Sequence, residues 1–321
     1  MNPIKSNDLR SKKITSWVLL LILPMVVSAC GLSDSGREAT LTDGLSTTTI
    51  AQDTDDDLLA VVMKRGTLRV ALEAIYKPDS FLDNLGNIIG FNPDVIEEVA
   101  RRLGIDRVEY VEPSFQIIVG GNWQGRWDVS IHSLTITEER QNILLFTQPY
   151  LYSNASVAIH KDNTNIVDSE TDLDRKIIGT CSGCAQQRYL EMDLSLPGVE
   201  FVFLIDDADI RPYQGGTTVA YEDLALGDGT RLDAVLAEVE SICNQIENGK
   251  PIKLVPDKKV MFSDVNGIAF DALALDDATG LRDEIDLIIS EMHADGTLTE
   301  ISMEWYGWDR TQPGGFPPAC G

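Results

Sequence analysis

Short strand-like runs and amphipathic helix-like runs follow each other along most of this chain. Apolar residues at every second position over 68–72 indicate a half-buried strand, and a three-to-four spacing over 95–103 indicates a helix. The same reasoning predicts strands near 108–111, 127–131, 176–179, 201–204 and 232–236, and helices near 117–122, from 137, and at 185–192, 221–226, 281–292 and 297–305. Such alternation predicts an α/β fold, and its restart near residue 176 predicts a second lobe.

Three helix starts carry capping signals. Asp57 precedes an apolar run that stops at Gly66, which predicts a short capped helix. Asn92, followed by Pro93, is expected to cap the next long helix. The run Thr297-Leu298-Thr299-Glu300 fits a capping box and predicts the start of the last helix.

The N-terminus carries an export signal. Four Lys or Arg residues precede an apolar stretch over 14–27, which is too short to span a membrane but long enough for a signal peptide. Ser28 and Ala29 lead into Cys30, a pattern that resembles the bacterial lipobox, in which the cysteine is acylated after cleavage just before it. We predict a lipoprotein signal peptide over 1–29 and a lipidated Cys30, carrying acyl chains such as palmitate, on a flexible tether over 30–57. The alternative is an ordinary signal peptide and a chance cysteine.

The composition of the mature chain excludes some partners. Removal of 1–29 leaves 22 basic against 50 acidic residues, a net charge of −28. Nucleic acid and anionic lipid headgroups would repel such a chain, so neither is an expected partner, and the membrane is reached through the lipid on Cys30. Roughly 290 mature residues suit two lobes of ordinary domain size.

Four cysteines remain besides Cys30, an even number in an oxidising compartment, which predicts disulfides. Three pairings are possible. We favour Cys181–Cys184 with Cys243–Cys320. Zinc is the rival for the Cys-x-x-Cys, but a second such pair is absent and the three histidines are scattered, so no metal is expected.

The motifs point to binding rather than catalysis. The chain lacks a P-loop, a Rossmann glycine fingerprint, H-E-x-x-H and G-x-S-x-G, so neither a cofactor nor a catalytic residue is predicted. The run from Ser133 to Arg140 places hydroxyls and backbone N–H groups before a helix, with an arginine in its first turn. This arrangement suits a carboxylate.

Residues 58–307 carry a set of motifs that resembles one protein family. Its motifs are Gly66–Val70, Gly90–Val95, Thr135–Arg140 with Phe146-x-x-Pro149-Tyr150, Leu232–Val235, Asp295–Thr297 and Trp305–Gly307. In order and spacing these resemble the family 3 extracellular solute-binding proteins, the amino-acid receptors of ABC importers.

The resemblance implies a type II periplasmic-binding-protein fold of two α/β lobes with the ligand between them. The crossing segments are expected near 150–154 and 262–267. Lobe 1 is then 58–151 plus 266–321, and lobe 2 is 154–263. The implied partners are an amino acid and ABC permease subunits, and the implied state is an extracytoplasmic, lipid-anchored monomer.

The resemblance also implies roles for single residues. Arg140 matches the clamp for the ligand α-carboxylate, assisted by Thr135, with the Ser133 carbonyl facing the ammonium. Glu238 matches the acid that binds the ammonium, although the family usually has Asp there. For Arg140 and Glu238 the alternative is an exposed side chain on its own helix.

Five further positions are implied to line the site. Tyr76 and Phe115 match aromatic positions that sandwich the ligand, or else pack in the core. Glu73 matches an acidic position that senses the ligand side chain, or else is solvated. Gly183 and Cys184 stand where the family commonly has Gly and Ser or Thr, so a disulfide-bonded Cys184 leaves only backbone N–H groups as anchors.

His132 and Glu73 bear on which amino acid is expected to bind. His132 lines the pocket by position, as a ligand contact or as a buried, satisfied histidine. Glu73 as an unpaired charge favours arginine, lysine or ornithine, then glutamine, with aspartate and glutamate last, unless it pairs with Lys77 or another basic residue. The alternatives to a transport receptor are an enzyme resembling cyclohexadienyl dehydratase and an extracytoplasmic sensor lobe.

Overall fold

The computed structural model describes residues 57–314. The predicted signal peptide, the lipid acceptor Cys30, nearly all of the tether and Cys320 lie outside the described residues, so the predictions that fall on them stay predictions.

Within 57–314 the main sheet has ten strands, in the order β10-β9-β11-β8-β13-β6-β1-β5, with β12 paired to β8 and β7 to β13. The strands are β1 (Thr67–Ala71), β5 (Arg107–Val111), β6 (Val129–Thr135), β7 (Leu144–Phe146), β8 (Leu151–His160), β9 (Ile177–Cys181), β10 (Asp209–Tyr213), β11 (Ala234–Glu238), β12 (Ile252–Leu254) and β13 (Phe262–Asp271). A small antiparallel sheet holds β2 (Ile75–Tyr76), β3 (Ser80–Leu82) and β4 (Ile88–Ile89).

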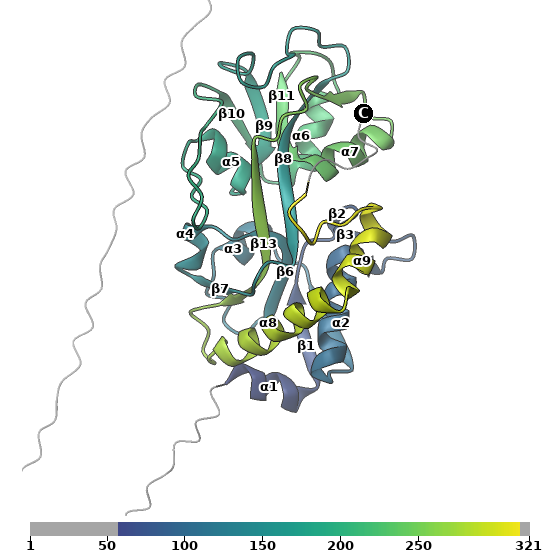
Figure 1. Ribbon diagram of the computed structural model, residues 1–321, viewed down its shortest axis with the longest axis vertical. Coiled ribbons are helices and arrows are strands. Elements are labelled where there is room, and N and C mark those ends of the chain that lie inside the picture. Colours follow the sequence, from purple (N-terminus) through teal and green to yellow (C-terminus); the bar gives the residue numbers. More distant parts are fainter. Residues whose placement is uncertain (1–56, 315–321) are drawn as a thin grey trace, which may run out of the picture. The chain divides into compact units, whose positions relative to one another are not determined.

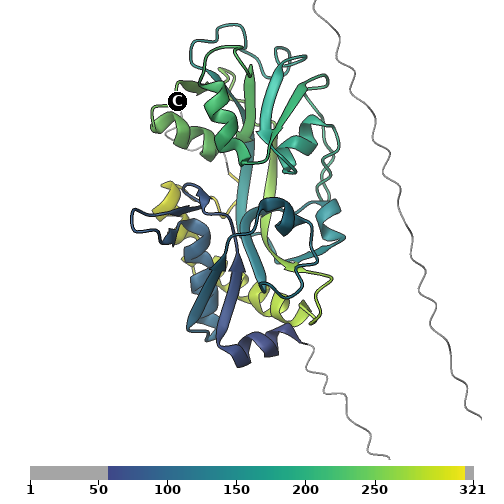
Figure 2. The same ribbon diagram turned by 180° about the vertical axis from the view of Figure 1, so that it is seen from behind.

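Two long strands join the two halves of the main sheet (Figures 1 and 2). β8 and β13 pair antiparallel, with Leu151 opposite Asn266 and Ala155 opposite Phe262. One end of β13 pairs with β6 and β7, whereas β8 continues to β11 and β12. The crossing segments predicted from the sequence, near 150–154 and 262–267, fall largely on these two strands, and the predicted lobe bounds stay a prediction.

Separate apolar cores form on either side of this crossing. In what we call lobe 1, the main core is formed by β1, β6 and the apolar sides of four helices: α1 (Leu58–Arg65), α2 (Phe91–Leu103), α8 (Thr279–Ala294) and α9 (Thr297–Tyr306). A second apolar cluster, around Trp123 and Trp127, includes α3 (Phe115–Val119). α4 (Glu138–Gln141) follows β6. In lobe 2, α5 (Ala185–Leu190) packs with one core, and α6 (Gly216–Leu224) and α7 (Val239–Glu247) with another. Each fully buried Leu, Ile or Val contributes about 2 kcal/mol to such a core.

The first capping prediction is confirmed and the other two are wrong. Asp57 accepts a hydrogen bond from the Leu59 N–H at 3.0 Å and caps α1. α2 starts two residues earlier than predicted, with Gly90 as its cap, because Asn92 is buried and bonds other side chains. α9 is capped by Gly296, and the Thr297 hydroxyl instead contacts Asp295 and Arg102.

The strand predicted at 201–204 is also wrong, because that segment is irregular and the edge strand is β10, at Asp209–Tyr213. The apolar alternation in this segment has another cause, because Phe201 and Phe203 pack on Tyr189. The centroid of the Tyr189 ring lies 6.4 Å from that of Phe201 and 5.3 Å from that of Phe203. Side chains that cover a core can show the same period as a strand.

The Cys181–Cys184 disulfide predicted from the sequence is present. Because both sulfur atoms are bonded to each other, this pair is not a zinc site in this structure. The second predicted pair includes Cys320, outside the described residues.

No helix within 57–314 is both long and apolar enough to cross a membrane.

Candidate functional site

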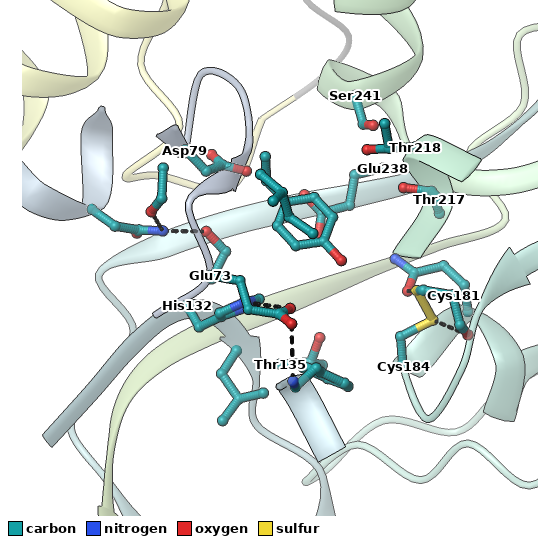
Figure 3. A pocket seen from close by; sticks show the side chains of 18 of the residues that line it. Glu73, Asp79, His132, Thr135, Cys181, Cys184, Thr217, Thr218, Glu238 and Ser241 are labelled. Carbon is teal, nitrogen blue, oxygen red and sulfur yellow. Dashed lines mark hydrogen bonds and ion pairs between the residues drawn. A yellow bond between two sulfur atoms is a disulfide. The ribbon is translucent and has the colours of Figure 1, made fainter. Parts of the chain in front are cut away.

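A cleft between the two lobes gathers nearly all the residues predicted from the sequence. Its lining includes Glu73, Tyr76, Phe115, His132, Ser133, Thr135, Arg140, Cys184 and Glu238, and of the predicted residues only Gly183 is not part of that lining. Figure 3 shows Glu73, His132 and Thr135 on one wall, with Glu238, Ser241 and the Cys181–Cys184 disulfide on the lobe 2 side. Segments far apart in the sequence therefore meet at one place.

Arg140 is a buried residue of the cleft lining, and Thr137 caps the short helix that carries it. Its Nη1 donates to the Thr135 carbonyl at 2.8 Å and its Nη2 to the Gly183 carbonyl at 3.2 Å, so it connects both lobes. Its guanidinium lies 5.5 Å from the centre of the Phe115 ring. Burial lowers the pKa of Arg140 to about 10, so the group is a cation at neutral pH. A guanidinium has more donors than these two bonds use, which leaves capacity for an anion.

Thr135 is engaged differently from the sequence expectation. Its hydroxyl donates to Oδ2 of the buried Asp264 at 2.7 Å, so its proton points away from an incoming carboxylate. Burial raises the pKa of Asp264 to about 6, although the bond from Thr135 opposes the shift.

Glu73 has partners within the protein. Its Oε1 accepts from the Phe115 N–H at 3.1 Å, and its Oε2 lies 3.3 Å from Nε2 of His132. Lys77, the alternative partner considered from the sequence, instead lies 5.2 Å from the Phe81 ring. Glu73 therefore has a backbone hydrogen bond within the protein, and this partner lowers the need for a cationic ligand group beside its carboxylate.

Ser133 lies where β6 bends, with φ of 45°, a conformation uncommon for residues other than glycine. The Tyr150 hydroxyl accepts from the Ser133 N–H at 3.0 Å and donates to Oδ1 of Asn92 at 2.8 Å. Asn92 Nδ2 lies within hydrogen-bond distance of the Ser133 hydroxyl, at 3.2 Å. A network of α2, β6 and Tyr150, the residue just before β8, thus holds the strained turn in place.

Glu238 ends β11 and occupies the cap position of α7, facing the cleft from lobe 2. Burial is the main cause that raises the pKa of its carboxyl well above its usual range, and nearby Asp79 adds to it. Arg310 opposes the shift, with its Nη2 3.8 Å from Oε2 of Glu238.

The loop between β9 and α5 is joined by the disulfide at the cleft. Cys181 and Cys184 both line it. Gly183 lies between them with φ of 76°, and its N–H donates to Oε1 of Gln187 at 2.7 Å. The N–H that the sequence assigned to a ligand carboxylate is therefore engaged by Gln187 in this structure.

Sequence reasoning missed a polar wall. The missed lining residues include Asp79, Ser80 and Asn92 from lobe 1 and Gln186, Thr217, Thr218, Ser241, Asn244 and Gln245 from lobe 2. The run Gly215-Gly216-Thr217-Thr218, at the start of α6, was a usable signal for hydroxyls in the first turn of a helix. Asp79 offered no such signal, because it lies in a short loop between β2 and β3. No cluster of three or more metal-binding side chains occurs in the part of the chain that the structure describes.

Known proteins resemble this chain along most of its length. The L-cystine-binding protein TcyJ of Escherichia coli (strain K12) is 27% identical over 296 residues, covering 88% of this chain and 99% of that relative. The L-cystine-binding protein TcyA of Bacillus subtilis (strain 168) is 28% identical over 297 residues, covering 90% and 97%. A solved structure of an ancestral arginine-binding protein bound to arginine aligns with a TM-score of 0.64 at 27% identity, covering 76% of this chain and 99% of that one.

The fold seen here is therefore the two-lobed fold of amino-acid-binding proteins. Residues 68–308 match the sequence pattern of one family, described as bacterial extracellular solute-binding proteins, family 3. The match spans nearly all of both lobes described above. The chain belongs to the bacterial extracellular solute-binding proteins, family 3.

Proposed function

We propose that this protein is the substrate-binding component of an ABC importer and binds an L-amino acid between its lobes. Arg140 binds the α-carboxylate and Glu238 the α-ammonium. The observation that carries the proposal is that a buried arginine of lobe 1 and a carboxylate of lobe 2 line the same cleft. A zwitterion is the ligand that satisfies both, and by bridging the lobes it shifts the population toward the closed form.

The side chain of the ligand is polar or basic in this proposal. Tyr76 and Phe115 offer aromatic faces, and the hydroxyls and amides of lobe 2 offer hydrogen bonds. Relatives that bind L-cystine and arginine support this range. Because Glu73 is partnered, glutamine or cystine competes with the basic amino acids more closely than the sequence suggested.

The setting of this function is proposed to be extracytoplasmic. The chain is a monomer held at the membrane by lipid on Cys30 and delivers its ligand to permease subunits. Mass spectrometry of the membrane-associated protein tests the anchor: a diacylated or triacylated N-terminal cysteine is expected, and an unmodified residue there contradicts it.

A thermal-shift screen of the soluble chain from residue 31 tests the ligand class. Any ligand that binds only the folded state raises the apparent stability. We expect shifts with arginine, lysine, ornithine, glutamine or cystine, and none with aspartate or glutamate. A panel of all amino acids without a shift rejects the proposed function.

Calorimetry then tests the clamp with whichever amino acid gave the largest shift. Arg140→Ala should lower affinity about 30-fold to several thousand-fold, since truncation of one partner in a buried charge pair costs roughly 2–5 kcal/mol. Arg188→Ala is the matched control, because Arg188 pairs with Glu139 across the cleft edge but does not line the cleft. A loss below threefold in folded Arg140→Ala rejects the assignment.

An enzyme on the same scaffold is the second candidate, favoured by the raised pKa of Glu238, since a protonated carboxyl could act as a general acid. The relatives reported above are binding proteins, which favours the first candidate. Steady product formation from prephenate or arogenate, lost in Glu238→Gln, would reverse this order.

A further inference from the structure

The segment after α9 returns to the crossing strands and carries a buried arginine. The Arg310 N–H donates to the Ser302 hydroxyl at 2.8 Å, and the Arg310 carbonyl accepts from the Tyr152 N–H, also at 2.8 Å. Further on, the Gly314 carbonyl accepts from Nδ2 of Asn154 at 3.0 Å. The segment is therefore fixed along β8, one of the two strands that join the lobes. Arg310 lies just beyond residue 308, where the family match ends.

The guanidinium of Arg310 contacts both sides of the cleft. Nη2 lies 3.2 Å from Oε2 of Glu240 and 3.8 Å from Oε2 of Glu238, both in lobe 2. Nη1 lies 3.5 Å from Oδ1 of Asp79 in lobe 1. Nη2 also donates to the Ser153 hydroxyl in β8 at 3.0 Å. The Arg310 side chain is fully buried, so water screens these contacts little.

Three carboxylates thus share one cation. Within residues 57–314, the ion pairs of Glu238 and Glu240 are both with Arg310. Both carboxylate oxygens of Glu240 are buried and lack a hydrogen-bond partner among the described residues. A buried carboxylate that loses its counter-charge takes up a proton instead. Whether these acids are charged therefore depends on Arg310.

We propose that Arg310 is a positioning residue of the ligand site, which keeps the carboxylate of Glu238 ionised and oriented for the ligand ammonium. This inference rests on the proposed role of Glu238 in amino-acid binding. Arg310 does not replace the ligand cation, because it lies behind the cleft lining while Glu238 forms part of that lining. It offsets the charge of Glu240 and Asp79, so that Glu238 can remain an anion.

The other charged groups around Glu238 favour its protonated, neutral form over the anion. They are Asp79 from the loop after β2, Asp264 from β13 and Glu240 from α7, with Tyr76 and Tyr221 as neutral hydroxyls near it. Burial and these acids raise the pKa of Glu238, whereas Arg310 lowers it. Arg140, a buried cation in the cleft lining, interacts with Asp264.

The first experiment does not require a ligand. NMR titration of ¹³C-labelled glutamate carboxyl carbons, assigned with Glu238→Gln and Glu240→Gln, follows the coupled Glu238–Glu240 pair in the free protein. In Arg310→Gln its apparent pKa values should rise by about one unit or more, as expected for loss of a contacting opposite charge. Arg310→Lys should restore most of the change. Arg69→Gln is the control, because Arg69 contacts another buried acid, Asp128, at 2.7 Å.

The second experiment measures affinity against pH with the amino acid that gave the largest thermal shift. In Arg310→Gln affinity should fall roughly tenfold per pH unit below the raised pKa, while the wild-type affinity starts to fall only at lower pH. An equal loss at every pH, or an unchanged NMR titration, overturns the inference. Should Arg310→Gln fail to fold, Glu240→Gln provides the test: it should lower the pKa of Glu238, and no change would reject the charge sharing.

The two experiments separate the two claims. If the titration shifts as expected but no amino acid binds, the charge sharing stands and the proposed function fails. If amino acids bind but the Arg310 variants leave both profiles unchanged, the function stands and this inference fails.

Discussion

Contact between Tyr76 of lobe 1 and Gly216 of lobe 2 offers a direct test of lobe closure. Gly216 starts α6 with φ of 73°, and a Cβ placed there would lie 2.9 Å from Cζ of Tyr76 and still closer to its hydroxyl. Gly216→Ala should therefore carry two costs. One is backbone strain at positive φ, and the other is a clash that exists only while the lobes are together.

Gly198 separates these costs. Its φ is 72°, nearly that of Gly216, but a Cβ there would meet no atom within 4 Å. Both alanine variants should lose about 1–2 kcal/mol of folding stability from the left-handed backbone. Only Gly216→Ala should also lose affinity, because closure must then overcome an overpacking cost of about 1–3 kcal/mol. This cost corresponds to a loss of ligand affinity of about 5- to 150-fold.

Chemical denaturation measures the strain, and calorimetry with the amino acid found by the thermal-shift screen measures the affinity. Tyr76→Phe combined with Gly216→Ala removes the nearest atom of the clash and should recover part of the affinity. The reasoning is refuted if Gly216→Ala binds within twofold of Gly198→Ala.

Two further predictions concern stability. Reduction of Cys181–Cys184, or Cys181→Ser with Cys184→Ser, should lower the free energy of unfolding by roughly 2 kcal/mol, as expected for so short a loop, and urea denaturation with and without dithiothreitol checks this. Asp264 keeps its proton up to about pH 6 when folded but releases it near pH 4 when unfolded, so its contribution to stability is lost as pH rises through this window. Between pH 4 and 6.5 the free energy of unfolding should therefore fall by about 2 kcal/mol less in Asp264→Asn than in the wild type. Urea denaturation across this pH range measures the fall, and an equal dependence on pH in the two proteins would contradict the prediction.

The elements that the sequence predicted well are those in which local signals agree with the packing. Asp57 and Gly66 bracket α1 as expected, and the stripe over 95–103 is the buried face of α2. In such segments the apolar period and the capping residues favour the same boundaries. Asn92 shows the limit, because a good capping residue is used instead to bind Tyr150 and Ser133.

The site was predictable where it depends on motif order, and not where it depends on long-range approach. Arg140 and Glu238 could be placed by position, and both line the cleft. The partner of Glu73 could not, because His132 is 59 positions away and their contact depends on how β6 lies beside β1. Arg310 could not be foreseen either, since nothing local indicates that a residue after the last helix returns to β8.

Exposed contacts between the lobes add little to the free energy of closure. At the cleft edge, Arg188 pairs with Glu139 at 2.5 Å and the Ser195 hydroxyl donates to Glu138 at 2.6 Å, but Arg188 is only half-buried and the other three residues are exposed. Exposed pairs of this kind contribute about 0–1 kcal/mol each. A shift from a mostly open to a mostly closed population needs about 5.5 kcal/mol of differential affinity. Exposed pairs cannot supply this amount, so groups buried on both sides must do so, and in the proposed function the ligand between them. For this reason the charge state of Glu238, and with it Arg310, should determine how tightly the protein closes.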